Sequence, residues 1–438
     1  MGNIISIILQ LIASLSILVL VHEIGHFLFA RIFKVRVDKF YLFFNPWFSL
    51  FKFKPKNSHT EYGIGWLPLG GYVKIAGMVD ESMDREQMSK PPQTWEFRSQ
   101  PAWKRLLIMV AGVVFNFLLA ILIYAGILFH WGKEYVRMQD VATGMEFSQT
   151  AKNIGFQDGD ILLSADGVHL EQFGESTFRQ IIESKEVKVQ RDGEAVSVFI
   201  PDDFMIRLLQ DKQGFANYRI PFVITSVLKD SPAEKAGLMG GDSIIAVNDS
   251  VAFLSDCISA FASHKGEPVL LTVVRHGQQQ KITITPDNEG KIGVYKKILS
   301  DFYPVRKTTY SLLEAIPAGI QKGVRKLTGY VNDMKYVFTK EGAQNIGGFG
   351  MIASMFPYPF DAQAFWEMTA LLSVILAFMN ILPIPALDGG HVLFLLYEVI
   401  TRRKPSDRFM ETAQIIGMIF LFSLLIYANL NDVFRLLF

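Results

Sequence analysis

The chain has 438 residues, of which 50% are hydrophobic, and its formal net charge is only +1. A charge balance so close to neutral gives no reason to expect nucleic-acid binding. The single cysteine, Cys257, excludes an intrachain disulfide and a metal site built from several thiolates. Because the apolar residues concentrate towards the two ends of the chain, the composition predicts a membrane protein with a soluble central region.

Four apolar segments are long enough to cross a membrane: residues 4–30, 106–129, about 368–396 and about 415–430. Prolines 383 and 385 and the pair Gly389–Gly390 interrupt the third segment. Lysines and arginines cluster after the first segment and between the third and fourth, which predicts that these loops are cytoplasmic. Both termini and the central region are therefore expected on the outer side of the membrane.

In the first segment, "VHEIGHF" places His22 and His26 four residues apart, on one face of a helix. This spacing lets one zinc ion bind both imidazoles, while Glu23 stands beside the metal in a position to act on a water molecule. Ionisable groups inside a membrane span are costly and are usually functional. The alternative is that both histidines only make hydrogen bonds between helices.

A hydrolytic zinc site needs a third protein ligand and one open position. The segment "MNILPIPALDGGHVLF" offers Asp388, with His391 as a competitor. Its prolines and glycines free backbone polar groups, which are tolerated at membrane depth only in a buried site or a cavity. In the same segment, the Asn380 amide could donate a hydrogen bond to a carbonyl oxygen, or it could simply pack between helices.

The central region contains a repeat. The segment "AKNIGFQDGDILLSADG" (151–167) aligns without a gap with "AEKAGLMGGDSIIAVND" (233–249). The pattern resembles PDZ domains, which bind an extended peptide or a C-terminus at a sheet edge. The alternative is a pair of β-rich spacers that bind no ligand. After the repeat, the apolar spacing from Leu313 to Phe338 predicts an amphipathic helix, which packs either on the repeat or along the membrane surface.

Between the first two spans, "TEYGIGWLPLGGYVKIAGM" (60–78) contains two β-type runs joined by "LPLGG", which predicts a hairpin. A free hairpin edge could pair with an unwound substrate strand. The predicted substrate-binding residues are therefore Tyr62, Gly63, Ile64, Gly65, Gly70 and Gly71. The alternative is a hairpin anchored at the membrane interface by its aromatic residues, without contact to substrate.

Together, the HEIGH sequence, the Asn-x-x-Pro-x-Pro-x-Leu-Asp-Gly-Gly segment and the intervening repeat resemble the site-2 protease family of intramembrane zinc metalloproteases. The hairpin segment likewise resembles the family's membrane-reentrant β-loop. The resemblance implies one Zn²⁺ per chain, bound by His22, His26 and Asp388, with Glu23 as the catalytic base and Asn380 helping to bind substrate. It also implies substrates in the bacterial inner membrane that are single-span membrane proteins, such as anti-sigma factors, or signal-peptide remnants. The sequence "AGVVFNF" departs from the family pattern, since Val113 replaces a proline, and predicts a straighter second span.

The expected fold is a polytopic α-helical membrane protein with four spans, a membrane-associated β-hairpin and two tandem PDZ-like domains between the second and third spans. The expected divisions are residues 1–132, 133–215, 216–300, 301–364 and 365–438. The active site should lie near the cytoplasmic side, because His26 is close in sequence to Arg31 and the basic loop. A catalytically silent PDZ scaffold and a metal transporter are the competing functions. The intact set of His22, Glu23, His26 and Asp388 argues against the scaffold.

Overall fold

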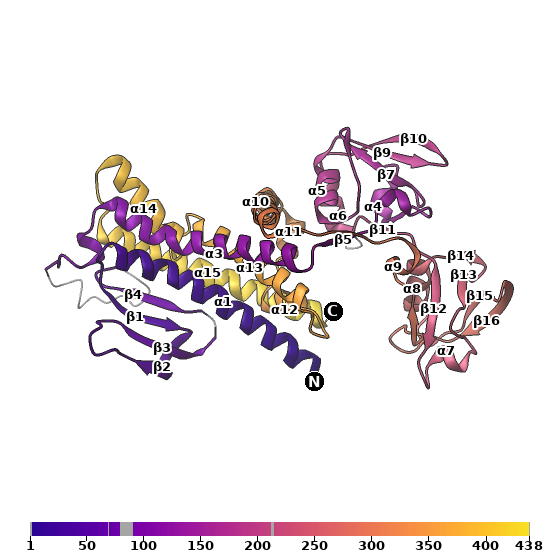
Figure 1. The fold of residues 1–438 in the computed structure, drawn as a ribbon, viewed down its shortest axis with the longest axis horizontal. Helices are drawn as coiled ribbons and strands as arrows, with labels where there is room; N and C mark the ends of the chain where they lie inside the picture. The colour runs from indigo at the N-terminus through magenta and orange to yellow at the C-terminus, as the bar shows by residue number, and fades with distance from the viewer. Residues whose placement is uncertain (1, 69, 79–90, 212–213, 438) are drawn as a thin grey trace. The chain divides into compact units, whose positions relative to one another are not determined.

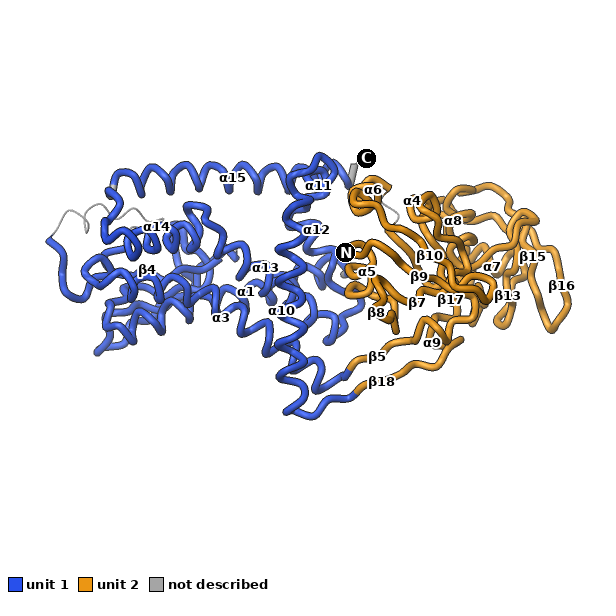
Figure 2. Tube along the Cα trace, turned by 90° about the horizontal axis from the view of Figure 1, so that it is seen from above, with its two compact units in different colours: residues 1–132, 309–438 blue, residues 133–308 orange. Residues whose placement is uncertain are grey.

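The computed structural model describes residues 2–68, 70–78, 91–211 and 214–437 (Figure 1). The chain forms two compact units, coloured separately in Figure 2. The first unit combines residues 1–132 with residues 309–438, and the second contains residues 133–308.

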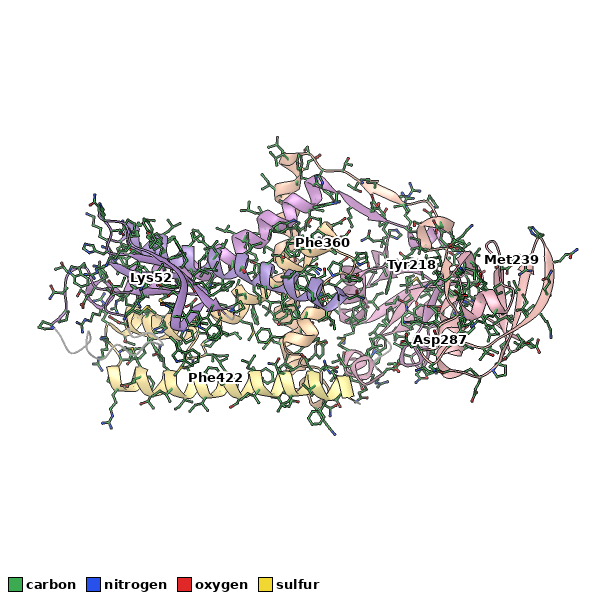
Figure 3. All side chains as sticks on the ribbon, turned by 90° about the horizontal axis from the view of Figure 1, so that it is seen from below. Lys52, Tyr218, Met239, Asp287, Phe360 and Phe422 are labelled. Carbon is green, nitrogen blue, oxygen red and sulfur yellow. The ribbon has the colours of Figure 1, made fainter. Side chains whose placement is uncertain are left out.

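Among the described residues, four helices are long and apolar enough to cross a membrane. They are α1 (Gly2–Ile32), α3 (Ala102–His130), α13 (Ala362–Ile381) and α15 (Asp407–Leu437). The four predicted spans are thus confirmed by length and composition. Their surfaces are apolar, as lipid surroundings require: Phe422 on α15 (Figure 3) is 61% exposed.

The third span is shorter than predicted. Helix α13 ends at Ile381, residues 382–387 are irregular, and α14 (Asp388–Thr401) begins at Asp388. Pro383 and Pro385 cause the break, because proline has no backbone N–H to continue the helical hydrogen bonds. The glycine pair 389–390, predicted to contribute to the break, lies instead inside the first turn of α14.

Helix α10 (Leu312–Val337) confirms the predicted amphipathic helix, and it packs on α3. Its buried residues are small: Ala315, Gly319, Gly323 and Gly329. A Cβ atom on Gly319 would lie 2.7 Å from the backbone nitrogen of Ala125, so glycine permits this close approach. The apolar stripe that predicted the helix is exposed instead, with Leu313 at 83%. The shorter helices of this unit are η1 (Phe97–Ser99), α11 (Lys340–Gln344) and α12 (Phe349–Ser354).

A four-stranded sheet follows α1 in the chain. It contains β1 (Val37–Leu42), β2 (Phe44–Phe53), β3 (Glu61–Leu67) and β4 (Tyr72–Ile75), in the order β2-β3-β1-β4. Strand β1 is parallel to β3 and antiparallel to β4, and β2 is antiparallel to β3. In Figure 1, β4 lies nearest to α1, and β2 lies at the far side of the sheet.

The predicted hairpin is therefore wrong in its strand pairing, because β1 lies between β3 and β4. The segment Val37–Leu42 competes successfully for this place, since it buries Val37 and Tyr41. The Tyr41 hydroxyl donates to Glu61 Oε1 at 2.7 Å. A Cβ atom on Gly63 would lie 2.3 Å from the Tyr41 ring, so this glycine makes room for the aromatic side chain of β1. Residues 60–78 alone carry no sign of this additional strand, which lies about 20 residues earlier in the sequence.

The second unit begins and ends with the antiparallel pair β5 (Lys133–Tyr135) and β18 (Arg306–Thr308). Its first half contains η2 (Met138–Asp140), β6 (Met145–Phe147), α4 (Gln149–Lys152), β7 (Ile161–Ala165), β8 (Val168–His169), α5 (Glu175–Glu183), β9 (Glu186–Arg191), β10 (Glu194–Phe199), α6 (Phe204–Asp211) and β11 (Ala216–Tyr218). Its second half contains β12 (Phe222–Val227), α7 (Pro232–Lys235), β13 (Ser243–Val247), β14 (Ser250–Val251), α8 (Leu254–Ser263), β15 (Val269–Arg275), β16 (Gln278–Ile284), β17 (Val294–Lys296) and α9 (Leu299–Phe302). The segments aligned by sequence form the same elements in the same order, and each half has its own apolar core.

An ion pair present in both halves explains the aspartate that the repeat shares. Arg191 bonds both carboxylate oxygens of Asp160 at 2.7 Å, and Arg275 bonds both oxygens of Asp242 at 2.7 Å. Burial alone would raise the pKa of the Asp242 carboxyl, but hydrogen bonds from Arg275 and the Met239 N–H hold it below its ordinary value. The pair ties the Gly-Asp turn to the hairpin in each half.

Candidate metal centre

The two histidines of α1 point towards each other within the first unit. The Nε2 atoms of His22 and His26 lie 3.2 Å apart, and both residues are buried. The four-residue spacing on one helical face brings them together, as the sequence predicts.

Asp388 completes the cluster from the first turn of α14. Its Oδ2 lies 3.1 Å from His22 Nε2 and 3.3 Å from His26 Nε2. The glycine pair after Asp388 lets this turn pack tightly. A Cβ atom on Gly389 would lie 2.0 Å from the Leu382 carbonyl oxygen, and one on Gly390 would lie 2.6 Å from the Pro385 Cα. The helix break therefore sets the position of the carboxylate.

These three atoms fit a zinc ion. Tetrahedral zinc with ligand bonds of about 2.0–2.2 Å holds its ligand atoms about 3.3 Å apart, and the observed separations are 3.1–3.3 Å. Asp388 Oδ2 is buried without a hydrogen-bond donor in the structure. The two Nε2 atoms and Asp388 Oδ2 would repel one another if their lone pairs met with no proton between them. A cation among the three atoms removes this repulsion. His391, the competing ligand, is not in the cluster; its Nε2 lies 2.6 Å from the Gln414 side-chain nitrogen.

Groups on α3 orient the two imidazoles. His26 Nδ1 lies 2.9 Å from the Ile108 carbonyl oxygen, so Nδ1 carries the proton and the Nε2 lone pair faces the cluster. His22 Nδ1 lies 3.2 Å from Nδ2 of Asn116, a fully buried residue whose backbone oxygen accepts a bond from Ser373. The Asn116 side-chain oxygen is buried without a partner, so turning the amide over would satisfy this oxygen with a proton on His22 Nδ1 and give His22 the same tautomer. The segment "AGVVFNF" contains Asn116 but assigns it no role, because only the packing of α3 on α1 reveals the contact.

Gly112 is a second contribution of α3 that the sequence did not reveal. A Cβ atom there would lie 2.4 Å from His26 Nε2 and 2.7 Å from His22 Cε1. On α1, a Cβ atom on Gly25 would lie 2.6 Å from the Ala111 carbonyl oxygen. Two glycines facing each other therefore bring α3 against the histidines.

A cavity of about 370 Å³ opens onto the cluster. The residues that line it include the three clustered side chains, Glu23, His391 and Gln414, together with Gly71, Tyr72, Val73 and Ile75 from β4 and the turn before it. Asn380 lies at the edge of the cluster, with its Nδ2 3.5 Å from His22 Nε2. Of the six predicted hairpin residues, Gly71 lines the cavity, while Tyr62, Gly63, Ile64 and Gly65 belong to the interior strand β3. Strand β4 was missed as the cavity wall because its place at the end of the sheet depends on the position of β1.

Buried histidines and a carboxylate between apolar helices, beside a cavity that holds a further glutamate, have the chemistry that a zinc hydrolase site needs, within a fold whose helices are apolar enough to cross a membrane. Comparison with known proteins supports this class: the sequence matches Peptidase family M50 over residues 10–424. The chain belongs to this family and is a zinc metalloprotease. The predicted family and the predicted zinc cofactor are confirmed at this level.

Individual relatives match along nearly their whole length. The regulator of sigma-E protease RseP of Salmonella typhimurium is 29% identical, with 97% of this chain and 98% of that protein aligned. The regulator of sigma E protease of Haemophilus influenzae is 28% identical over the same shares. A Neisseria meningitidis protein named as a zinc metalloprotease is 30% identical, covering 98% of this chain and 99% of that protein. The four apolar helices and these relatives fit a bacterial inner-membrane protein.

We expect Asp388→Asn to lower zinc affinity on the order of 100-fold or more, because it replaces the charged ligand atom by a neutral amide. Zinc per chain is measured by elemental analysis of the detergent-purified protein after dialysis against a graded chelator. The matched control is His391→Gln, which changes a residue on the next turn of α14 and should retain zinc. Zinc retained by the asparagine variant and lost from the glutamine variant would make His391 the ligand.

Proposed function

We propose that the chain hydrolyses peptide bonds within the membrane spans of single-span membrane proteins. In this proposal His22, His26 and Asp388 hold one zinc ion, Glu23 is the general base and Asn380 binds the substrate carbonyl. The observation that carries the proposal is that Glu23, the three clustered side chains and strand β4 line one cavity. A silent scaffold is not favoured, since it gives no reason for ligand atoms to converge within 3.3 Å.

Bound zinc supplies a Lewis acid that makes water nucleophilic near neutral pH. Glu23 takes a proton from the attacking water as the new C–O bond forms. The Asn380 N–H donates to the carbonyl oxygen as negative charge develops on it. Glu23 then passes its proton to the amide nitrogen, so that the C–N bond breaks and a neutral amine leaves.

Strand β4 offers a way to present the substrate. Among the described residues it stands at the end of the sheet, next to β1, and its residues line the cavity. An extended segment that pairs with the outer edge of β4 would place its backbone carbonyls along the cavity. A membrane span must unwind to do this, and strand pairing supplies new partners for the freed N–H and C=O groups.

The test uses the full chain in liposomes with a synthetic single-span peptide of about 30 residues. We expect a cut within the span, found by the masses of both products. N-methylation of the peptide, one residue at a time beside the cut, should then lower the rate about tenfold at every second residue, because alternate N–H groups of a strand face its neighbour. Intervening positions are the matched control. Equal losses at all positions would contradict strand pairing, and a cut only outside the span would contradict the proposed substrate class.

The membrane orientation follows from basic residues in the same unit. Arg31 lies in the last turn of α1, and Arg402, Arg403 and Lys404 lie between α14 and α15. By the positive-inside rule these ends are cytoplasmic, so both termini and the second unit lie on the outer side. The active site is then close to the cytoplasmic surface, where water is available.

The two halves of the second unit are proposed to be PDZ-like domains, covering residues 133–215 and 216–300. They act on the outer part of a substrate, either by capturing a peptide C-terminus or by excluding substrates with bulky outer domains. The equivalent elements in both halves and the matching Arg191–Asp160 and Arg275–Asp242 pairs support two copies of one domain. Since relatives are named regulators of sigma E, anti-sigma factors are the proposed substrates.

A further inference from the structure

A second polar cavity lies beside the end of α1 and takes no part in the proposed reaction. Its volume is about 450 Å³, and its lining consists of Arg31, Lys34, Val35, Arg36, His59 and Trp95. Three of these side chains are cationic at neutral pH, and among the described residues that line the cavity there is no carboxylate. Asp38, outside the lining, accepts a bond from Arg36 Nε at 2.7 Å. The cavity therefore retains an excess of positive charge.

The backbone at Lys34 is unusual for a lysine. Its φ is 60°, in the left-handed region. Val35 N donates to the Ala30 carbonyl at 2.8 Å and Lys34 N donates to the Arg31 carbonyl at 3.1 Å, which is the Schellman pattern at a helix end. This left-handed conformation favours glycine, because a Cβ atom destabilises it. The backbone conformation therefore gives no reason for a lysine at position 34, whereas its ammonium group adds a positive charge to the cavity.

A simpler role for these cations would be to complement the negative end of α1. The two N–H groups at this end already satisfy the carbonyls of Ala30 and Arg31, which reduces the need for a further cation. It also reduces the repulsion that an anion would meet at a helix C-terminus. The lysine is thus better explained by a ligand than by the helix dipole.

Neighbouring groups hold Arg36 and the backbone next to His59 in place. Arg36 N donates to the Trp95 carbonyl oxygen at 3.0 Å, and the guanidinium carbon lies 4.8 Å from the centre of a Trp95 ring. The segment that carries His59 is attached to β1, since Thr60 Oγ1 donates to the Val37 carbonyl oxygen at 2.8 Å. Arg36 is therefore already ordered, which lowers the cost in side-chain ordering when an anion binds, while Arg31, Lys34 and His59 are exposed and open to a ligand.

The cavity lies where α1 leaves its apolar surroundings. Leu28 and Ile32 in the last turns of the helix are 40% and 64% exposed, as expected for contact with lipid tails. Trp103, at the start of the neighbouring span α3, is 51% exposed and packs edge-on against Phe33. Tryptophan is enriched at the level of lipid headgroups. The cations therefore lie at the depth where phosphate groups of a bilayer are found.

We propose that this cavity binds a phosphate group through Arg31, Lys34, Arg36 and His59, and that its source is the headgroup of an anionic phospholipid. Arginine and lysine both suit phosphate oxygens, and basic pockets beside membrane helices bind anionic headgroups. Free inorganic phosphate carries the same chemistry and is the other source. The site is separate from the metal centre and does not depend on the proposed proteolytic function.

The test places the full chain in phosphatidylcholine nanodiscs and measures its preference for spin-labelled phosphatidylglycerol over spin-labelled phosphatidylcholine. Lys34→Gly should lower this preference about fivefold, and adding Arg31→Gln should lower it further. Lys34→Gly should also melt at the wild-type temperature or above, because glycine suits the backbone there. The matched control is Lys54→Gln, which removes one exposed charge from the segment between β2 and β3, outside the lining of the cavity. A second arm titrates inorganic phosphate into the detergent-purified protein by calorimetry.

A preference lost in Lys34→Gly and retained in Lys54→Gln supports a lipid phosphate at this site. Phosphate binding in the calorimeter, abolished by Lys34→Gly and without lipid preference in nanodiscs, supports the site with inorganic phosphate as its source. An equal loss of the phosphatidylglycerol preference in Lys34→Gly and Lys54→Gln would mean that the preference comes from general surface charge, and would overturn the proposal. No preference and no phosphate binding in the wild type would overturn it too.

Discussion

Gly112→Ala is expected to weaken zinc binding on the order of 100-fold, although Gly112 offers no ligand atom. The new Cβ would lie 2.4 Å from His26 Nε2 and 2.7 Å from His22 Cε1, which is closer than nonbonded atoms can approach. Both imidazoles would have to turn away, which also disturbs the bonds of their Nδ1 atoms to Ile108 and Asn116. Displacing the groups that orient metal ligands typically costs 10–100-fold in affinity, and moving the ligands themselves should cost about the upper value.

The matched control is Gly126→Ala on the same helix, where a Cβ atom would meet nothing within 4 Å. It makes the same chemical change, and alanine raises helix propensity at both sites. Zinc affinity is measured by competition with a colorimetric chelator, and folding by the thermal transition. Wild-type zinc affinity in Gly112→Ala would mean that the helices separate easily, and would contradict the tight packing of α3 on the histidines.

The parts of the candidate metal centre that carry a local sequence signature could be predicted, and those that depend on helix packing could not. The spacing of His22 and His26 alone places them on one helical face. Asp388 follows a helix break that Pro383 and Pro385 predict. Asn116 and Gly112 reach the site from α3, about 90 residues away from the histidines in sequence. Nothing in the local pattern of a uniformly apolar helix distinguishes the face that meets the histidines from the face that meets lipid.

The sheet shows the same limit. Residues 60–78 contain two strands, as predicted, but their partners were assigned by proximity in sequence. The parallel pairing of β1 with β3, in which Lys39 lies opposite Glu61, joins segments about 20 residues apart. Because of this pairing, Tyr62, Gly63, Ile64 and Gly65 lie on a strand with neighbours on both sides in the sheet, and β4 lies beside the cavity. One inserted strand thus changes which residues can meet a substrate.

Glu23→Gln is expected to lower the rate of peptide hydrolysis by about 10²–10⁴-fold while leaving zinc bound, because a glutamine cannot accept and return a proton. Glu23 lines the cavity but is not one of the three clustered side chains, so its charge should not be needed to hold the metal. Glutamine has nearly the same shape, and the variant should still bind the peptide substrate. We therefore expect full zinc content, an unchanged substrate affinity and a loss confined to turnover.

The measurements are zinc per chain, binding of the single-span peptide in nanodiscs, and the rate of product formation by mass spectrometry. His22→Phe is the comparison that separates the two roles, because it should lose zinc and activity together. Loss of zinc in Glu23→Gln would make the glutamate a ligand. Retained turnover would require another base, and His391 lines the same cavity 2.6 Å from Gln414. Only loss of turnover with zinc and substrate still bound makes Glu23 the group that moves the proton.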